Sequence, residues 1–274
     1  MPNLALMVAA SLGNVVNDPA FLPALLAYSA SLNPSAPNIT GLTINPQYGD
    51  SSGVLANQIV GGSRPDVFMP VSDTDQYPLT IVSNAGLVAS STPVFRNNLV
   101  LIKNRAAGLP TPIISFQQVD AVHTTAPNAV NIIIGNPDGI YNVPAGVYAQ
   151  LSFQYFGSAV WNWIFSNTGG NVTMLTNVTA VLNAVINATT PTIGAVYATD
   201  AVSSLVTSPS VQNPVEIIAV APAPVNIKVI YPAVQIVGRP NPNGATEFVN
   251  FLQTSAAMTI FLKWGFIPYS PITP

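Results

Sequence analysis

The sequence is poor in charge and contains no cysteine, and these two absences narrow what the protein can be. Without cysteine it has no disulfide, no thiolate metal ligand and no thiol nucleophile. Charged residues make up 6 % of the chain, against about a quarter in ordinary soluble proteins. The lysines and arginines number 7, lie scattered along the chain, and leave a formal net charge of −3. The basic surface that nucleic acid requires is therefore missing, and we expect no nucleic-acid partner.

Long apolar runs are also missing, although 49 % of the residues are hydrophobic. No run reaches the ~20 residues of a membrane-spanning helix. Residues 1–10 lack the basic start of a secretory signal and instead predict a first strand over Leu4–Val8. Serine, threonine, asparagine and glutamine supply the polarity, so we expect an ordered protein with a neutral surface. If the natural protein is exported, this chain is the mature form without its signal peptide.

The scarcity of charge has two explanations that the sequence leaves open. One is a working environment of low pH. With only 10 Asp and Glu and 7 Lys and Arg, protonation of the carboxylates removes few stabilising charges and leaves few cations to repel one another. The other is compositional drift, or a surface adapted to packing. A stability curve that collapses at mildly acidic pH would exclude the first.

Residues with catalytic potential are few and badly placed. His123 is the single histidine, and it lies in a proline-flanked connection with no nucleophile pattern nearby. Asp73 and Asp75 are the closest pair of carboxylates, but no metal-ligand spacing follows them. No nucleophile elbow, phosphate loop or dinucleotide fingerprint is present. We expect neither an enzyme nor a resident metal or cofactor.

Apolar periodicity predicts strands alternating with helices, which indicates an α/β fold with largely parallel sheets. The first helix begins near Ser11 and is expected to break at Asp18-Pro19. Strands are expected at Leu4–Val8, Thr40–Asn45, Asp66–Met69, Leu99–Ile102, Asn131–Ile134, Ile193–Tyr197, Glu216–Val220 and Pro232–Val237. Further helices are expected from Ser52, as the capping residue, to Gly61, from Pro144 through Val147, Leu151 and Tyr155, from Val178 to Ile186, and from Gly244 to Gly265.

Four of these helices begin with small or hydroxyl-bearing residues. They are Ala9-Ala10-Ser11, Ser51-Ser52-Gly53, Pro144-Ala145-Gly146 and Asn177-Val178. Helix starts offer N–H groups without intrahelical partners, and in an open parallel sheet they gather at the carboxyl ends of the strands. One such serine alone is usually only a cap, but four similar starts favour an anion site. Neutral donors would select an oxyanion by size and geometry.

At these residues the chain resembles the molybdate-binding proteins of ABC transport systems, within the type II periplasmic binding protein class. The matching segments lie in the family's order along nearly the whole chain. They are Ala9–Leu12, Ser51–Ile59, Arg64–Phe68, Asn98–Ile102, Gly135–Pro137, Val143–Tyr148, Gly194–Ala201, Tyr231–Val234 and Trp264–Phe266.

The resemblance implies two α/β lobes with mixed, mostly parallel sheets flanked by helices, and a ligand cleft between the lobes. Lobe I would comprise residues 1–97 plus 219–274, and lobe II residues 98–218. It further implies a monomeric, periplasmic or cell-surface receptor that closes on a tetrahedral oxyanion and docks on a membrane permease.

The resemblance also implies a donor for each position that matches the family's motif. Ser11 and Ser52 would each give a hydroxyl and an N–H, Ala145 and Val178 would each give a backbone N–H, and Tyr197 would give its phenol. A one-residue shift of the alignment would select Thr179 in place of Val178.

The chain departs from the family pattern in three places. Gly135-Asn136-Pro137 stands where the family has Gly-Asp-Pro, and Asp138–Asn142 lengthens the loop after it. Asp50 precedes the serine turn, and Pro19 and Pro23 interrupt the first helix. Two alternatives therefore stay open: a protein of this fold for another anion or a small organic acid, and a surface protein that has lost the site.

Overall fold

The computed structural model describes residues 3–44, 51–72, 78–119, 122, 129–138, 142–166, 170–207 and 213–269. His123, Asp73, Asp75 and Asp50 lie outside the described residues. The chain folds into two compact units. The first unit comprises Met1–Arg96 and Ile230–Pro274, and the second comprises Asn97–Val229.

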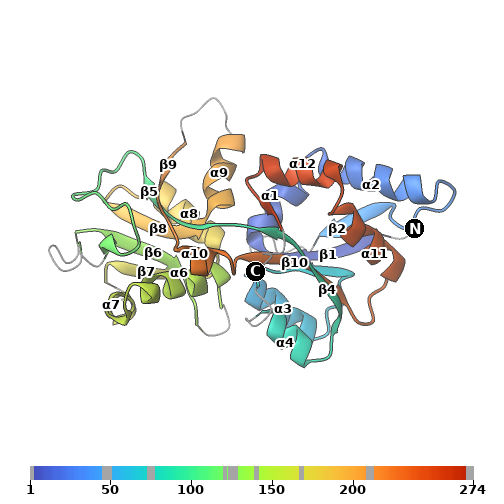
Figure 1. Ribbon diagram of the computed structural model, residues 1–274, viewed down its shortest axis with the longest axis horizontal. Helices are drawn as coiled ribbons and strands as arrows, with labels where there is room; N and C mark the ends of the chain where they lie inside the picture. Colours follow the sequence, from blue (N-terminus) through green and yellow to red (C-terminus); the bar gives the residue numbers. More distant parts are fainter. Residues whose placement is uncertain are drawn as a thin grey trace. The chain divides into compact units, whose positions relative to one another are not determined.

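The first unit is built on a sheet with the strand order β11-β4-β10-β3-β1-β2 (Figure 1). Its strands are β1 (Asn3–Val8), β2 (Gly41–Ile44), β3 (Val67–Met69), β4 (Val88–Arg96), β10 (Ile230–Ile236) and β11 (Ile267–Pro268). β1 pairs in parallel with β2 and β3, whereas β10 runs antiparallel to both β3 and β4. The helices are η1 (Ala10–Leu12), α1 (Gly13–Val16), α2 (Phe21–Leu32), α3 (Ser52–Val60), α4 (Leu79–Asn84), α11 (Pro242–Phe251) and α12 (Ser255–Lys263).

Two hydrophobic cores cover the two faces of this first sheet. An aliphatic core joins α3 and α4 to one face, with Leu55, Ile59 and Val82 fully buried against Phe68 and Val234. Helices α2, α11 and α12 cover the other face (Figure 1), and contacts between aromatic rings join them there. These rings belong to Phe21, Phe95, Phe248, Phe251, Phe261 and Phe266. Edge-to-face contacts dominate, which suits the charge distribution of aromatic rings.

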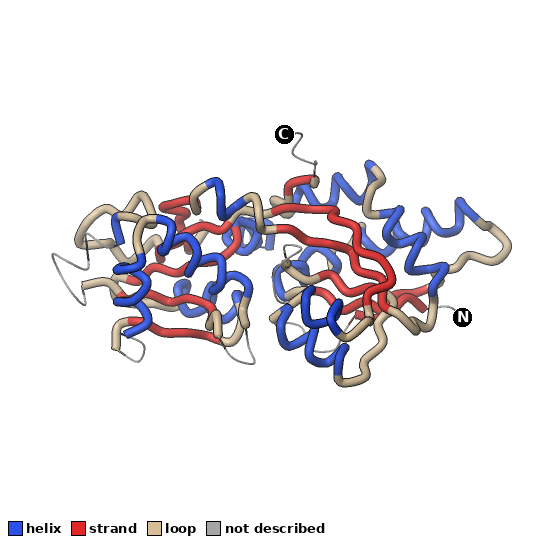
Figure 2. Tube along the Cα trace, turned by 60° about the horizontal axis from the view of Figure 1, so that its bottom comes forward, coloured by secondary structure: helices blue, strands red, loops and turns tan. Residues whose placement is uncertain are grey.

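The second unit is built on a sheet with the strand order β7-β6-β8-β5-β9. Its strands are β5 (Leu99–Asn104), β6 (Asn131–Gly135), β7 (Val172–Leu175), β8 (Thr192–Tyr197) and β9 (Val215–Val220). Its helices are α6 (Pro144–Tyr155), α7 (Ser158–Ser166), α8 (Val178–Ile186), α9 (Ala198–Thr207) and α10 (Ala223–Asn226). β6, β7 and β8 are parallel, and β5 runs antiparallel to β8 and β9. Figure 2 shows the strands of each sheet side by side with helices around them.

The fold class is confirmed, since both sheets are mixed and flanked by helices. Antiparallel pairing is more extensive than expected, because each sheet has one parallel and one antiparallel half. The second unit also extends further along the sequence than expected, to Val229 instead of residue 218. The reason is that β9 pairs with β5 inside the second sheet and α10 packs on α6.

Two local predictions were wrong. The helix expected over Gly244–Gly265 is two helices, because Thr254 begins a new one by accepting a hydrogen bond from the Ala257 N–H at 3.3 Å. The helix expected from Pro144 through Tyr155 is, in contrast, confirmed as α6, whose buried side chains include Tyr148, Ala149 and Phe153 while Tyr155 is 56 % exposed. Ser51, and not Ser52, caps α3, as described below.

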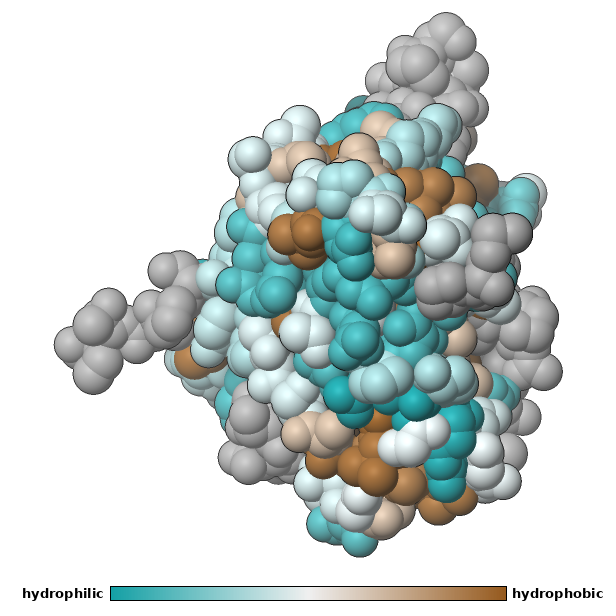
Figure 3. All heavy atoms as spheres, turned by 90° about the vertical axis from the view of Figure 1, so that its right-hand side faces the viewer, coloured by the Kyte–Doolittle hydropathy of each residue, from teal (hydrophilic) through white to brown (hydrophobic). Residues whose placement is uncertain are grey.

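The surface matches the neutral composition. On the face of the molecule shown in Figure 3, hydrophilic side chains surround separate small hydrophobic patches. Among the described residues only two ion pairs occur, Lys103–Glu216 at 3.3 Å and Lys263–Asp18 at 2.6 Å. Within that same part of the chain, no helix has both the length and the apolar character to cross a membrane.

Candidate functional site

The structure distributes the five predicted donors over the two units. Ser11 and Ser52 belong to the first unit and are here called the first donor set. Ala145, Val178 and Tyr197 belong to the second unit and are called the second donor set. Each set lies at the carboxyl edge of parallel strands, where an open sheet of this kind presents its helix starts.

The first donor set follows two neighbouring parallel strands. Val8, the last residue of β1, pairs with Met69, the last residue of β3, and Ser11 comes three residues after Val8. Ser52 joins the same edge through Val71, whose N–H donates to the Ser52 Oγ at 3.0 Å. Both serines are buried, at 6 % and 1 % exposure. The fold therefore brings these two hydroxyls to one edge of the first sheet.

Ser51 and Ser52 are neighbours in sequence but differ in role. Ser51 is extended, with φ −67° and ψ 153°, and its Oγ accepts the Val54 N–H at 3.3 Å as the helix cap. Ser52 is the first helical residue, so its hydroxyl cannot serve as that cap. Because its Oγ already accepts from Val71, its proton remains available for a bond that Ser52 itself donates. Among the described residues nothing accepts from the Ser52 N–H either.

Ser11 lies in η1 and has a buried aromatic partner. Its Oγ is 2.9 Å from the phenol oxygen of Tyr231 on β10, and either atom can be the donor. Tyr231 is fully buried, and its ring meets the Phe266 ring edge-to-face with the two ring centroids 5.1 Å apart. Local sequence patterns give no signal of this contact, because Ser11 and Tyr231 are 220 residues apart.

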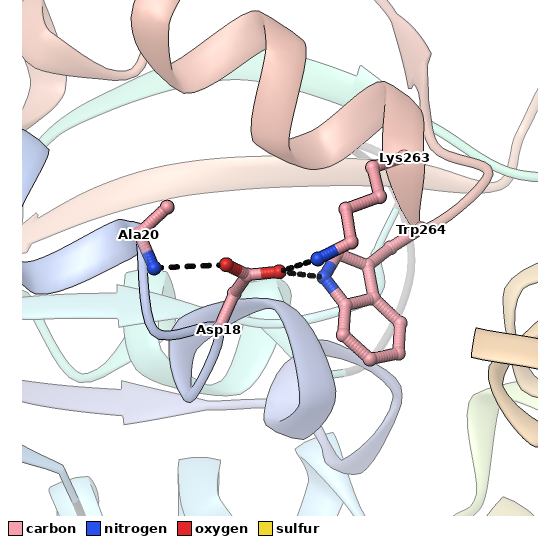
Figure 4. A network of polar contacts seen from close by, with 4 residues as sticks. All are labelled: Asp18, Ala20, Lys263 and Trp264. Carbon is pink, nitrogen blue, oxygen red and sulfur yellow. Dashed lines mark hydrogen bonds and ion pairs between the residues drawn. The ribbon is translucent and has the colours of Figure 1, made fainter. Parts of the chain in front are cut away.

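The chain that follows Ser11 is fixed by a buried carboxylate, Asp18 (Figure 4). Its oxygens accept from the Lys263 Nζ at 2.6 Å, from the Trp264 Nε1 at 2.9 Å and from the Ala20 N–H at 2.9 Å. Burial raises the pKa of Asp18, but these hydrogen bonds outweigh burial and leave the pKa below its usual value. The contact ties the turn between α1 and α2 to the end of α12, so it stabilises the segment that carries Ser11.

The second donor set follows β6, β7 and β8, three parallel neighbours. Gly135 at the end of β6 pairs with Leu175 at the end of β7, and Val178 begins α8 three residues later. Tyr197 is the last residue of β8. Ala145 returns to the same edge because the Val143 N–H donates to the Asn136 carbonyl at 2.8 Å, directly beyond β6. All three donors are buried.

The start of α6 lies very close to the end of β6. A methyl group added at Gly146 would sit 2.0 Å from the Gly135 carbonyl oxygen, so only glycine allows this approach. Pro144 at the first helical position has no N–H, and the Gly146 N–H donates to the Val143 carbonyl at 2.8 Å. Among the described residues nothing accepts from the Ala145 N–H. The close packing thus presents one unclaimed backbone donor at the sheet edge.

The start of α8 is capped by Asn177, whose Oδ1 accepts the Ala180 N–H at 2.8 Å. This cap leaves the N–H groups of Val178 and Thr179 without an acceptor in the part of the chain that the structure describes. Val178 is buried and Thr179 is exposed. Both N–H groups therefore stay candidates, with Val178 the one enclosed by the protein.

A buried carboxyl group, that of Asp200, lies next to Tyr197. The buried Asp200 carboxylate accepts the Tyr197 N–H at 3.1 Å. Burial raises the pKa of Asp200 to about 7, and the hydrogen bond from Tyr197 only partly opposes this rise. The described residues include no group of three or more His, Asp or Glu that could hold a metal ion. The described residues of the two sets offer hydrogen-bond donors of the kind that an anion accepts.

The sequence matches the family model described as "Bacterial extracellular solute-binding protein" over residues 30–267. A curated relative from Bacillus subtilis (strain 168), named "Putative ABC transporter substrate-binding lipoprotein YvgL", is 27 % identical over 225 residues, which cover 82 % of this chain and 75 % of that protein.

Two solved structures show the likeness of fold. The periplasmic molybdate-binding protein of Azotobacter vinelandii superposes with a TM-score of 0.68 at 15 % identity, covering 98 % of this chain and 100 % of that chain. The sulfate-binding protein SubI of Mycobacterium tuberculosis H37Rv superposes with a TM-score of 0.64 at 14 % identity, covering 99 % of this chain and 88 % of that chain. At these identities the likeness establishes the fold and leaves the ligand open.

Proposed function

The chain belongs to the bacterial extracellular solute-binding proteins, and on this premise we propose that it is an extracytoplasmic receptor for a tetrahedral oxyanion, molybdate or tungstate. It delivers the anion to the membrane permease of an ABC transporter and catalyses no reaction. It acts as a monomer and needs no cofactor, the oxyanion being its cargo. The two donor sets, one on each unit, close on a single anion by a hinge motion.

The observation that carries this proposal is the set of neutral donors whose hydrogens are left unclaimed. Ser52 accepts a bond at Oγ and keeps its proton to donate, and the N–H groups of Ala145 and Val178 have no acceptor among the described residues. Buried donors without acceptors are costly unless a ligand satisfies them. A dianion enclosed by N–H and O–H groups satisfies several of them at once and excludes a protonated competitor, whose own O–H would face a donor.

The ligand is tested by isothermal titration calorimetry with molybdate, tungstate, sulfate and phosphate at several pH values. We expect molybdate and tungstate to bind alike, because the two ions have nearly the same size and charge, and sulfate to bind more weakly because it is smaller. Tight binding of sulfate or phosphate alone would assign a different anion to the same fold. Absence of any anion binding would favour a protein that has lost the site.

The neighbouring serines provide a matched pair of variants. Ser52→Ala removes a proposed ligand donor and should weaken anion binding by about 1.5–3 kcal/mol, the worth of a hydrogen bond to a charged group. Ser51→Ala removes the helix cap and should lower the free energy of unfolding by about 1 kcal/mol with little change in affinity. Equal affinities for Ser52→Ala and the parent protein would refute the site.

A further inference from the structure

Tyr231 touches a proposed ligand donor at the point where the chain re-enters the first unit. Val229 is the last residue of the second unit, and Ile230 is the first residue of β10. Tyr231, the next residue, places its phenol oxygen 2.9 Å from the Ser11 Oγ. The contact is buried, with Tyr231 at 0 % and Ser11 at 6 % exposure.

The strand around Tyr231 is firmly held. Ile230 pairs with Arg96, the last residue of the first unit before the chain leaves it, and Tyr231 pairs with Phe95. The Ile230 carbonyl accepts the Ser72 N–H at 2.9 Å. The two stretches through which the chain passes between the units therefore run side by side at this point. A phenol fixed to this strand has a fixed position relative to the place where the chain crosses.

We propose that Tyr231 is a positioning residue that orients the Ser11 hydroxyl toward the anion. A serine hydroxyl has one proton, so Ser11 can donate to a ligand only if its bond with Tyr231 runs the other way. The phenol is the more acidic of the two groups and the better donor. With Tyr231 donating, the Ser11 proton is directed away from the ring and toward the sheet edge that also carries Ser52.

This inference rests on the proposed function. It also links the direction of the Ser11 hydroxyl to the position of β10. The Ser11 donor is attached through Tyr231 to the strand that enters from the second unit. A change in the path of that strand would change the direction of the Ser11 hydroxyl. Affinity for the anion would thereby be coupled to the geometry of the chain crossing.

A double-mutant cycle on the whole chain, measured by calorimetry with molybdate and, if that does not bind, with tungstate, sulfate and phosphate, tests the proposal. Tyr231→Phe keeps the ring and its contact with Phe266 but removes the hydroxyl. It should weaken binding about 5- to 10-fold when Ser11 is present, the size of one net hydrogen bond. In the Ser11→Ala background the same change should have less than about a 2-fold effect, because no hydroxyl is left to orient.

Tyr148→Phe is the matched control, because it also removes a buried phenol hydroxyl, one that donates to the Lys228 carbonyl at 2.6 Å. Its effect should be independent of Ser11→Ala, whatever it does to the melting temperature. If Ser11→Ala weakens binding while the effect of Tyr231→Phe is absent or the same in both backgrounds, the positioning role is overturned and the proposed function stands. If Ser11→Ala changes nothing, the Ser11 site and its positioning residue both fall.

Discussion

The two units present donors of different kinds at equivalent sheet edges. The first donor set relies on side-chain hydroxyls, which packing and a buried phenol orient. The second relies on backbone N–H groups at two helix starts, together with one phenol. A hydroxyl can be deleted by one substitution, whereas a backbone donor is lost only when the backbone moves or proline replaces the residue. The first set is therefore open to side-chain mutation, whereas the two backbone donors of the second set must be tested through backbone geometry.

The buried carboxyl groups differ in how far hydrogen bonds offset the effect of burial on their pKa. Asp18 in the first unit has three donors, and its pKa lies below the usual value. Asp200 in the second unit accepts from the Tyr197 N–H, and burial raises its pKa to about 7. Asp66 in the first unit is intermediate: burial raises its pKa although the Ala5 and Asn241 N–H groups both donate to it.

The largest expected effect is the pH dependence of stability caused by Asp200. An unfolded aspartate ionises near 3.8, whereas Asp200 in the native state stays protonated up to about 7. Between these values the native state binds the extra proton, so stability falls as pH rises, by at most about 1.4 kcal/mol per pH unit. Asp200→Asn keeps an acceptor for Tyr197 and should remove this fall, a difference of up to about 4 kcal/mol at pH 7.

Urea unfolding of the parent protein and Asp200→Asn between pH 2 and pH 8 measures this difference. Asp18→Asn is the control with the opposite sign, because the low native pKa of Asp18 stabilises the fold above about 3.8, the unfolded value, and this contribution is lost as pH falls below it. Parallel curves for the parent protein and Asp200→Asn would contradict the shifted pKa. A fall in stability with rising pH also agrees with the hypothesis that the protein works in acid.

The next effect concerns the close approach of α6 and β6 in the second unit. In Gly146→Ala the new methyl group would meet the Gly135 carbonyl oxygen at 2.0 Å, so the start of α6 must shift. We expect a loss of about 1–3 kcal/mol in unfolding free energy from overpacking, and weaker anion binding because Ala145 moves as well. Gly108→Ala is the control, since no atom lies within 4 Å of its added methyl group. Unchanged binding by Gly146→Ala would remove Ala145 from the site.

A smaller effect is expected from deleting the backbone donor of Val178. Proline is tolerated at the first helical position, and Asn177 before it is already extended at φ −159° and ψ 166°. Val178→Pro should therefore keep α8 and weaken anion binding by about 1.5–2 kcal/mol relative to Val178→Ala, which accounts for the lost side chain. Calorimetry on both variants, with circular dichroism to verify the helix, makes the comparison. Equal affinities of Val178→Pro and Val178→Ala would mean that the Thr179 N–H donates to the anion instead, or that the start of α8 does not contact the anion.

The sequence predicts the regular part of this fold well, because local periodicity determines it. The helix of Val178, Val181, Leu182 and Val185 appears with all four side chains buried, and the break at Asp18-Pro19 falls between α1 and α2. β4 was not predicted, since its serines and threonines give no apolar pattern. Which face of α6 is buried was not predicted, because the close contact between Gly135 and Gly146 that brings this helix onto β6 is not visible in the sequence.

The sequence predicts which residues make up the candidate site, but not the contacts that each of them makes. Sequence placed Ser11, Ser52, Ala145, Val178 and Tyr197 at helix starts or strand ends, and the structure gathers them at two sheet edges. Whether they bind an anion stays a prediction. The division of roles between Ser51 and Ser52 depends on where the helix begins to within one residue, and the contact of Ser11 with Tyr231 depends on long-range packing. Neither is visible in local sequence patterns.

The central claim is that neutral donors from both units bind one oxyanion. Anomalous X-ray diffraction from crystals grown with tungstate tests it most directly, because tungsten gives a strong anomalous signal that the light atoms of the protein do not give. We expect one strong peak, at the tungsten atom. The oxygens of the tungstate ion placed there should lie about 2.7–3.2 Å from the Ser11 and Ser52 hydroxyl oxygens and from the Ala145 and Val178 backbone nitrogens. A peak held by a lysine or arginine side chain, or by the donors of one unit alone, would contradict the account.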